Sequence, residues 1–334
     1  MDCSKVYKNS RRFAVAPMMD WTDRHCRYFH RIMTKHALLY TEMVVADAVL
    51  HGDRDMLLKF DQFEHPLALQ IGGSDPDKLA EAARIGEEYG YDEINLNVGC
   101  PSDRVQSGTF GACLMREPEL VGRCVAAMKE KVRIPVTVKC RIGVDDQDPM
   151  TALNNLAHEV WSQGCDSLWV HARKAWLEGL SPKENREVPP LDYERVYQLK
   201  TENAERFIGI NGGIENLEQT SDHLKTMDGV MLGRAAYQNP DILRYVDTAI
   251  FKNQTDIIST TEIMRQMCEY SERHLAEGGR LNQITRHMIG LFHGVPGARR
   301  YRQILSVDSV KKGAGPEVIE SAFTAVGPKQ IVAA

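Results

Sequence analysis

Cys100 stands in a sequence context suited to proton transfer. It lies between Gly99 and Pro101, just after the apolar run 93–98, and a glycine-bearing loop at 107–111 follows it. A lone cysteine is more often a small buried hydrophobe than a catalytic group. A thiol that leaves a strand end beside a glycine-rich loop is accessible, however, and with a pKa of about 8.5 it still carries its proton at neutral pH. We therefore predict that Cys100 is a general acid.

Polar and glycine residues also follow the other short apolar runs of the chain. One or two of them would be explained as hydrogen bonders that close a strand, but their recurrence after all eight runs predicts a ring of functional groups. The ring comprises Pro17, Met18, Met19, Asp20, Glu42, Gln70, Asn95, Asn97, Lys139, Arg141, His171, Arg173, Asn211, Gly212, Gly213, Gly233 and Arg234.

The last two members of this ring form a pattern typical of phosphate binding. Asn211-Gly212-Gly213 and Gly233-Arg234 end consecutive apolar runs. Glycines let backbone N–H groups approach an anion, and arginine adds positive charge. A Gly-Gly pair can also make an ordinary turn. Because the two loops occur together, we favour a phosphate site.

Lys139 ends an apolar run and would point into the centre of the ring. It could form a Schiff base, as in an aldolase, or stabilise negative charge on a flavin ring as a cation. A salt bridge to Glu42, or to another carboxylate at the mouth of the ring, is the structural alternative. Gln70 offers an amide to a heterocycle edge, and Met18-Met19 offers polarisable apolar surface, which favours the flavin.

Eight strand-like runs must position these residues. They begin near Phe13, Leu38, Pro66, Glu93, Val136, Ser167, Phe207 and Gly229. Their mean spacing of about 31 residues is the size of a strand–helix unit, and helical patterns such as 75–89 and 150–163 fill the intervals. Eight units favour an α/β fold, a (β/α)8 TIM barrel, over an open doubly wound sheet, and no Gly-x-Gly-x-x-Gly follows the first run.

The chain changes character after residue 250. Segments 263–275, 281–292 and 298–305 have helical spacing, with breaks at 278–279 and 294–297. We therefore expect two domains, a barrel over residues 1–250 and a small C-terminal all-α helical domain over residues 251–334.

The net charge of −5 gives no sign of a nucleic-acid partner, but it hides a local excess. Between Arg280 and Lys312 there are seven basic residues and one acidic residue. Arg299 and Arg302 would share one face of a helix, and arginine suits both phosphate binding and stacking on bases. A solvated basic helix packed on an acidic barrel is the alternative; we favour a surface for folded RNA.

Composition places the protein among ordinary globular proteins. Hydrophobic residues make up 43% and charged residues 26% of the chain. No apolar run reaches the length of about 18 residues that a membrane span needs. The start, Met1–Lys5, lacks the apolar stretch of a secretion signal, so we expect a cytoplasmic protein. The eight cysteines include no Cys-x-x-Cys pair, so we expect no metal site.

Assembled, these motifs resemble those of the tRNA-dihydrouridine synthases, in particular the subgroup that acts on positions 20 and 20a of the D-loop. The most specific segments are Ala16–Asp23, Leu96–Met115, Lys174–Arg186 and Asn211–Ile214, and the resemblance covers nearly the whole chain. It implies a TIM barrel that binds FMN, takes NADPH as reductant and reduces the 5,6 double bond of uridine in tRNA.

The resemblance also assigns roles to individual residues. Reduced FMN would give a hydride to carbon 6 of the uracil, and Cys100 would give a proton to carbon 5. The FMN contacts fall on Pro17, Met18, Met19, Gln70, Lys139, His171, Asn211, Gly212, Gly213, Gly233 and Arg234. The tRNA contacts fall on Asn97, Lys183, Arg186, Arg299 and Arg302. We expect a monomer with no membrane or metal partner.

Three other functions are compatible with the same residues. The first is an FMN oxidoreductase similar to dihydroorotate dehydrogenase, which acts on a free pyrimidine and needs no nucleic-acid surface. The second is a Schiff-base aldolase that uses Lys139. The third is a catalytically silent RNA-binding protein that keeps the barrel as a scaffold. A flavin spectrum would argue against the second and third, and the basic tail favours tRNA over the first.

Overall fold

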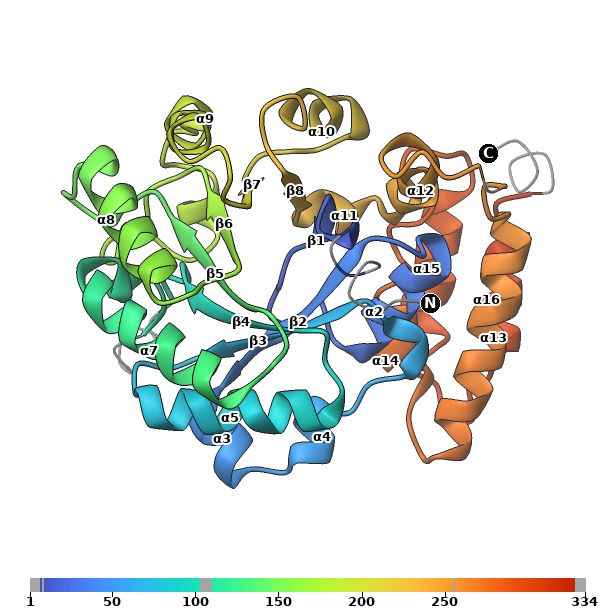
Figure 1. Ribbon diagram of the computed structural model, residues 1–334. Helices are drawn as coiled ribbons and strands as arrows, with labels where there is room; N and C mark the ends of the chain where they lie inside the picture. Colours follow the sequence, from blue (N-terminus) through green and yellow to red (C-terminus); the bar gives the residue numbers. More distant parts are fainter. Residues whose placement is uncertain (1–6, 8, 103–109, 255, 328–334) are drawn as a thin grey trace.

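The computed structural model describes residues 7, 9–102, 110–254 and 256–327. Its centre is a closed barrel of eight parallel strands that pair in sequence order, with β8 returning to β1 (Figure 1). The strands are β1 (Phe13–Val15), β2 (Leu38–Val45), β3 (Leu67–Gly72), β4 (Glu93–Val98), β5 (Val136–Arg141), β6 (Ser167–His171), β7 (Ile208–Asn211) and β8 (Gly229–Leu232). The predicted TIM barrel is confirmed. Met1–Lys5, residues 103–109 of the segment Leu96–Met115, and residues 255 and 328–334 of the predicted C-terminal domain lie outside the described residues.

Helices and short 3-10 turns surround the barrel (Figure 1). They are α2 (Arg24–Met33), α3 (Ala46–His51), α4 (Arg54–Leu58), η1 (Gln62–Glu64), α5 (Pro76–Tyr89), η2 (Gly111–Arg116), α7 (Pro118–Lys131), α8 (Pro149–Ser162), η3 (Glu184–Arg186), α9 (Tyr193–Glu202), α10 (Leu217–His223), α11 (Arg234–Gln238), η4 (Pro240–Tyr245) and α12 (Val246–Ala249). The predicted helices 75–89 and 150–163 correspond to α5 and α8. Asp75 caps α5, Pro76 opens it, and Gly90 ends it with a φ of 96°.

Large side chains fill the barrel interior. Tyr40 and Trp169 are fully buried and pack with Ala14 and Met231. Glycine is required at position 209 because a Cβ on Gly209 would lie 2.1 Å from the indole ring of Trp169. The barrel is therefore a packed core, and a ligand site is expected at the carboxyl ends of its strands.

In the described part of the chain after residue 250, four helices lie against one side of the barrel (Figure 1). They are α13 (Thr260–Ala276), α14 (Leu281–Thr285), α15 (Ala298–Val307) and α16 (Glu317–Thr324). Tyr28 of α2 stacks on Tyr270 of α13, with ring centroids 3.9 Å apart. Buried residues of these helices, such as Met267 and Ile284, belong to the same apolar cluster as the outer core of the barrel. The helical region and the barrel therefore share one continuous core.

The helical region differs from the prediction in two places. The segment predicted as one helix over 281–292 forms only α14, and turns follow it. The reason is tertiary: a Cβ on Gly290 would come within 2.5 Å of the carbonyl oxygen of Gln238, so close packing on the barrel shapes the chain there. In addition, α16 was not predicted.

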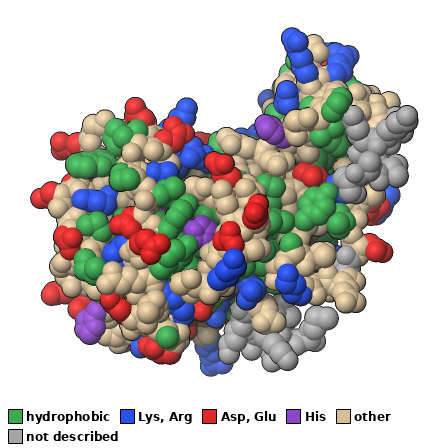
Figure 2. Space-filling view, turned by 90° about the horizontal axis from the view of Figure 1, so that it is seen from above, with side chains coloured by type: hydrophobic (Ala, Val, Ile, Leu, Met, Phe, Trp, Pro, Cys, Tyr) green, Lys and Arg blue, Asp and Glu red, His purple; other side chains and the backbone are tan. Residues whose placement is uncertain are grey.

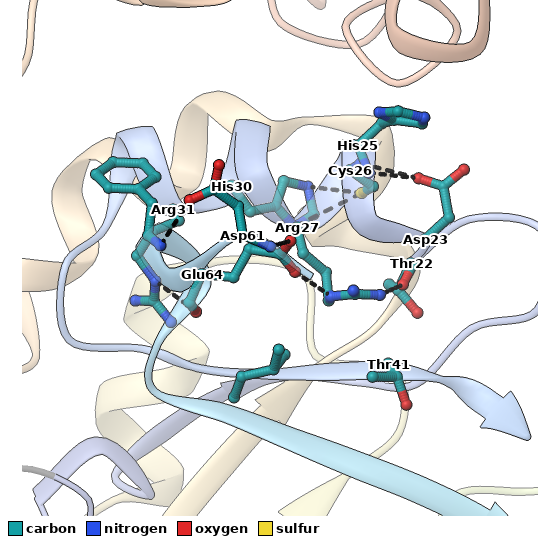
Figure 3. A network of polar contacts seen from close by, with 12 residues as sticks. Thr22, Asp23, His25, Cys26, Arg27, His30, Arg31, Thr41, Asp61 and Glu64 are labelled. Carbon is teal, nitrogen blue, oxygen red and sulfur yellow. Dashed lines mark hydrogen bonds and ion pairs between the residues drawn. The ribbon is translucent and has the colours of Figure 1, made fainter. Parts of the chain in front are cut away.

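Buried polar contacts fix α2, which faces these C-terminal helices (Figure 3). Asp23 caps α2 by accepting hydrogen bonds from its first backbone N–H groups. The buried guanidinium of Arg27 donates to Glu64 Oε2 at 2.6 Å and to the carbonyl oxygen of Thr22 at 2.8 Å. Separating such a pair would leave a buried charge without a partner. The position of α2 relative to the barrel is therefore well determined.

None of the helices in the described ranges combines the length and apolarity needed to span a membrane. Nor do the described His, Cys, Asp and Glu side chains form a group of three or more placed to hold a metal ion.

Candidate active site

A cavity of about 1120 Å³ opens where the barrel strands end. It brings together residues that are far apart in the sequence, as the predicted ring requires. The predicted site residues that line it are Pro17, Met18, Met19, Gln70, Asn97, Cys100, Lys139, His171, Arg186, Asn211, Gly212, Gly213, Gly233 and Arg234. The other three, Lys183, Arg299 and Arg302, are exposed on the surface outside its lining.

Asn97, near the end of β4, holds Cys100 at this cavity. The backbone N–H groups of Gly99 and Cys100 donate to Asn97 Oδ1 at 3.1 and 2.9 Å. The thiol of Cys100 is half-buried and lies 3.4 Å from Ser102 Oγ. The amide oxygen of Asn97 therefore determines where the thiol faces the cavity.

Asn97 also begins a chain of hydrogen bonds through the barrel interior. Its Nδ2 donates to Gln70 Oε1, and Gln70 Nε2 donates to Asn95 Oδ1, both at 2.8 Å. Asn95 Nδ2 donates in turn to Thr137 Oγ1 at 2.7 Å, and this hydroxyl donates to the buried Glu93. The oxygen and one N–H of Asn97 are thus used within the protein, which leaves its second N–H for a ligand.

Glu93 ends this chain and sets its direction. The carboxyl group also accepts hydrogen bonds from Tyr40 at 2.6 Å and from Tyr7. Burial raises the pKa of Glu93, whereas the hydroxyls of Thr137, Tyr40 and Tyr7 oppose this by stabilising the carboxylate. Because Glu93 can only accept when ionised, each amide of the chain gives one N–H to the next acceptor toward the barrel core and accepts on the side nearer the cavity.

Basic side chains outnumber acidic ones in the lining of the cavity. Its basic residues are Lys139, Arg141, Arg173, Arg186 and Arg234, and its acidic residues are Asp20, Glu187 and Glu215. Burial, and then the charge of Arg141, lowers the pKa of Lys139 to about 8. Burial lowers the pKa of His171, and the nearby Arg141 and Lys139 lower it further, so this ring is neutral. A bound anion would relieve the repulsion among these groups, so the cavity suits an anionic ligand.

The predicted phosphate loop has the backbone that it needs. Gly212 and Gly213 have φ values of 113° and 67°, and a Cβ on Gly212 would lie 2.5 Å from the ring of His171. Beside them, Lys139 Nζ donates to Asn211 Oδ1 at 3.2 Å. Within the described residues Lys139 thus contacts Asn211 and not the salt-bridge alternative, Glu42.

Several residues of the site received no role from the sequence. Arg141 donates to the carbonyl oxygens of Gly99 at 3.1 Å and Asn185 at 2.8 Å, and so joins the Cys100 segment to the loop after β6. The Nε atom of Arg173 is buried and has no hydrogen-bond partner among the described residues. Both arginines belong to the predicted ring, which was the available signal. His293, which lines the cavity from the C-terminal region, had none.

The basic residues of the C-terminal region lie on its surface. Arg299 and Arg302 are exposed on α15, whereas Tyr301 and Ile304 of the same helix are buried. Lys and Arg side chains gather on the projecting right-hand part of the molecule in Figure 2, the side on which the C-terminal helices lie in Figure 1. The predicted face of α15 is therefore available to a partner.

Known proteins resemble this chain over nearly its whole length. A family model described as dihydrouridine synthase (Dus) matches residues 14–326. The tRNA-dihydrouridine(20/20a) synthase of Shewanella oneidensis is 58% identical over 316 residues, which cover 95% of this chain and 94% of that protein. The tRNA-dihydrouridine(20/20a) synthase of Vibrio parahaemolyticus is 56% identical over 324 residues, which cover 97% and 99%. Among solved structures, morphinone reductase has a TM-score of 0.51 at 12% identity, covering 75% of this chain and 88% of that one, a likeness of fold. The chain belongs to the dihydrouridine synthase family.

Proposed function

We propose that this protein reduces uridine to dihydrouridine in the D-loop of tRNA, at positions 20 and 20a, with FMN as cofactor and NADPH as reductant. The observation that carries the proposal is the placement of Cys100, a thiol held by Asn97 at the mouth of a cationic barrel cavity. The names of the relatives from Shewanella oneidensis and Vibrio parahaemolyticus support the substrate and the two positions. We expect the enzyme to act as a cytoplasmic monomer.

The residues of the cavity fit FMN. Gly212, Gly213, Gly233 and Arg234 would hold the phosphate, and the unpartnered Nε of Arg173 offers a further donor to an anion. Gln70, Lys139 and His171 line the same cavity and would contact the ring system, with Pro17, Met18 and Met19 as apolar surface. When bound, FMN supplies the hydride that carbon 6 of the uracil receives.

The protein's own groups supply the remaining chemistry. Cys100 Sγ holds the proton that carbon 5 of the uracil receives, which is the role of a general acid. The free N–H of Asn97 can donate to the edge of the uracil and so hold the base in place. The ammonium group of Lys139 stabilises negative charge at the cavity floor.

The tRNA requires a second surface. The target base must leave the RNA stack to enter the cavity, and a loop nucleotide that is already partly unstacked lowers that cost. We assign the barrel, residues 1–250, to FMN and chemistry, and residues 251–334, with Arg299 and Arg302, to tRNA. Arg186, which lines the cavity, and the exposed Lys183 would contact the RNA from the loop after β6.

A Cys100→Ala enzyme tests the proposal. We expect purified protein of both forms to show a flavin spectrum and to oxidise NADPH equally well in the absence of tRNA. We expect the variant to form dihydrouridine in unmodified tRNA at least about a hundredfold more slowly, the usual contribution of a general acid. Dihydrouridine is measured by mass spectrometry of the tRNA. Wild-type turnover by the variant would refute the role of Cys100, and reduction of a free pyrimidine in preference to tRNA would refute the proposed substrate.

A further inference from the structure

A second cavity adjoins the active site. Its volume is about 540 Å³, and it lies between the β2 end of the barrel, α4, and α14 of the C-terminal region. Met19 and Met43 line both cavities, so one layer of side chains separates them. A polymer whose target unit occupies the first cavity would bring its neighbouring unit to the second.

The second cavity has apolar walls that are open to solvent. Met56 and Met19 are 73% and 53% exposed, which is unusual for methionine, and Leu57 and Ala48 are half-buried beside them. Methionine side chains adapt to flat, polarisable surfaces. These walls suit a planar ring that enters from the solvent.

The rim of the cavity is positively charged. Arg24, Lys59 and Arg286 line it. Arg286 pairs with Asp23, but the side chains of Arg24 and Lys59 have no hydrogen bond or ion pair with any described residue. Two free cations beside an apolar slot are complementary to a phosphate attached to a planar base.

The back wall of the cavity is rigid and carries a hydrogen-bonding group. Arg27 and Thr41 form part of that wall, and Figure 3 shows Arg27 joined to Glu64 and Thr22. The carboxyl group of Glu42 also faces the cavity. Burial raises the pKa of Glu42, while the backbone N–H of Asp20 partly offsets this. The carboxyl group can accept from a ring N–H of a base.

We propose that this second cavity binds the nucleotide next to the target uridine, with its base between Met19, Met56 and Leu57 and its phosphate on Arg24 and Lys59. The proposal rests on the proposed function, because it takes RNA as the substrate.

The test pairs a protein variant whose second cavity is filled by a larger side chain with a tRNA that lacks the base next to the target uridine. Ala48→Trp fills the cavity, and Lys59→Ala removes an exposed cation from its rim. Met150→Trp and Lys131→Ala are matched controls, because both residues are exposed on helices that do not line either cavity. Binding is measured with unmodified tRNA and with two tRNAs that carry an abasic residue on one side or the other of the target uridine.

We expect Ala48→Trp and one of the abasic tRNAs each to weaken binding about tenfold, the lower end of what one stacked base contributes. Combined, they should still weaken it about tenfold, because each removes the same contact. Lys59→Ala should weaken binding of every tRNA, and the controls should weaken none.

Two results would overturn the proposal. One is an additive loss of tRNA binding, about a hundredfold, when Ala48→Trp is combined with the abasic tRNA. The other is a raised KM for NADPH in Ala48→Trp with unchanged tRNA binding, which would assign the cavity to the reductant. The proposed function is read separately, from dihydrouridine formed by the wild-type enzyme. If no dihydrouridine forms while the losses of tRNA binding stay non-additive, the nucleotide site is supported and the proposed reaction is refuted.

Discussion

Replacement of Asn97 separates the positioning of Cys100 from the rest of the site. Asn97→Ala removes three hydrogen bonds, from the backbone N–H groups of Gly99 and Cys100 and to Gln70 Oε1. At about 1 kcal/mol of net stability for each bond, the free energy of unfolding should fall by about 3 kcal/mol. Because the thiol loses its anchor, kcat for tRNA should fall about a hundredfold, the scale of general-acid catalysis.

Asn97→Asp is the matched variant, because it keeps the acceptor for both backbone N–H groups. The amides of Gln70 and Asn95 can turn over so that Gln70 donates to the introduced carboxylate. Thr137 then donates to Asn95, and Glu93 loses one of its three donors. The net loss is about one hydrogen bond, or about 1 kcal/mol. The carboxylate lacks the free N–H of the amide, so the KM for tRNA should rise while kcat stays within about tenfold of the wild-type value.

Urea unfolding measures the loss of stability, and single-turnover formation of dihydrouridine measures the loss of rate. Flavin absorbance is the control for cofactor retention. Equal kcat values for Asn97→Ala and Asn97→Asp would refute the reasoning, because they would show that the acceptor for the Cys100 backbone is not what places the thiol.

Three further predictions concern charged groups. In a plot of log affinity for tRNA against log salt concentration, Arg299→Ala with Arg302→Ala should make the slope less steep by about 1.4 to 1.8. Arg300→Ala, on another face of α15, should leave the affinity unchanged. Filter binding at several salt concentrations checks this, and an unchanged slope would count against this face of α15 as a tRNA contact. Burial and Arg141 lower the pKa of Lys139 to about 8, so the charge of Lys139 is lost as the pH rises through that value. In a fluorescence titration, FMN should therefore bind about tenfold more weakly at pH 9 than at pH 7. Lys139→Met should remove most of this difference. Burial alone would raise the pKa of Asp23, but hydrogen bonds from a histidine and from the backbone hold the pKa well below its ordinary value, so this stabilisation is present at neutral pH and lost on acidification. Asp23→Asn should therefore lower the free energy of unfolding by about 1 kcal/mol at pH 7 and flatten its decline below pH 4. Acid unfolding of both proteins checks this, and equal losses of stability would contradict it.

The sequence predicted the barrel because its signals are local. Each strand is a short apolar run with its own turn, and the observed strands begin at or within about two residues of the predicted starts. The same reasoning failed at 281–292, where the contact of Gly290 with Gln238 decides the path of the chain. The short helix α16 did carry a signal, since Val318, Ile319 and Ala322 recur at helical spacing.

The sequence could predict which residues lie together at the end of the barrel, but not how they are connected. Strand ends meet at one end of a barrel, so residues such as Gln70 and Lys139 could be grouped by position alone. Which way the amide of Asn97 points depends on Glu93. Three hydrogen-bonded residues separate the two, and this link requires the three-dimensional structure. The adjoining cavity is equally inaccessible to sequence, because its walls come from β2, α4 and α14.

The continuous core between the barrel and the C-terminal helices limits how the enzyme can choose its target. Tyr28 stacks on Tyr270, and Tyr301 and Ile304 of α15 belong to the same apolar core, so we expect α15 to keep its place relative to the barrel. Arg299 and Arg302 therefore stand at a constant separation from Cys100. If the proposed function holds, an RNA bound by Arg299 and Arg302 and reduced beside Cys100 is measured along its backbone. We then expect the position of a uridine in the folded tRNA, and not the sequence around it, to decide whether it reaches the thiol.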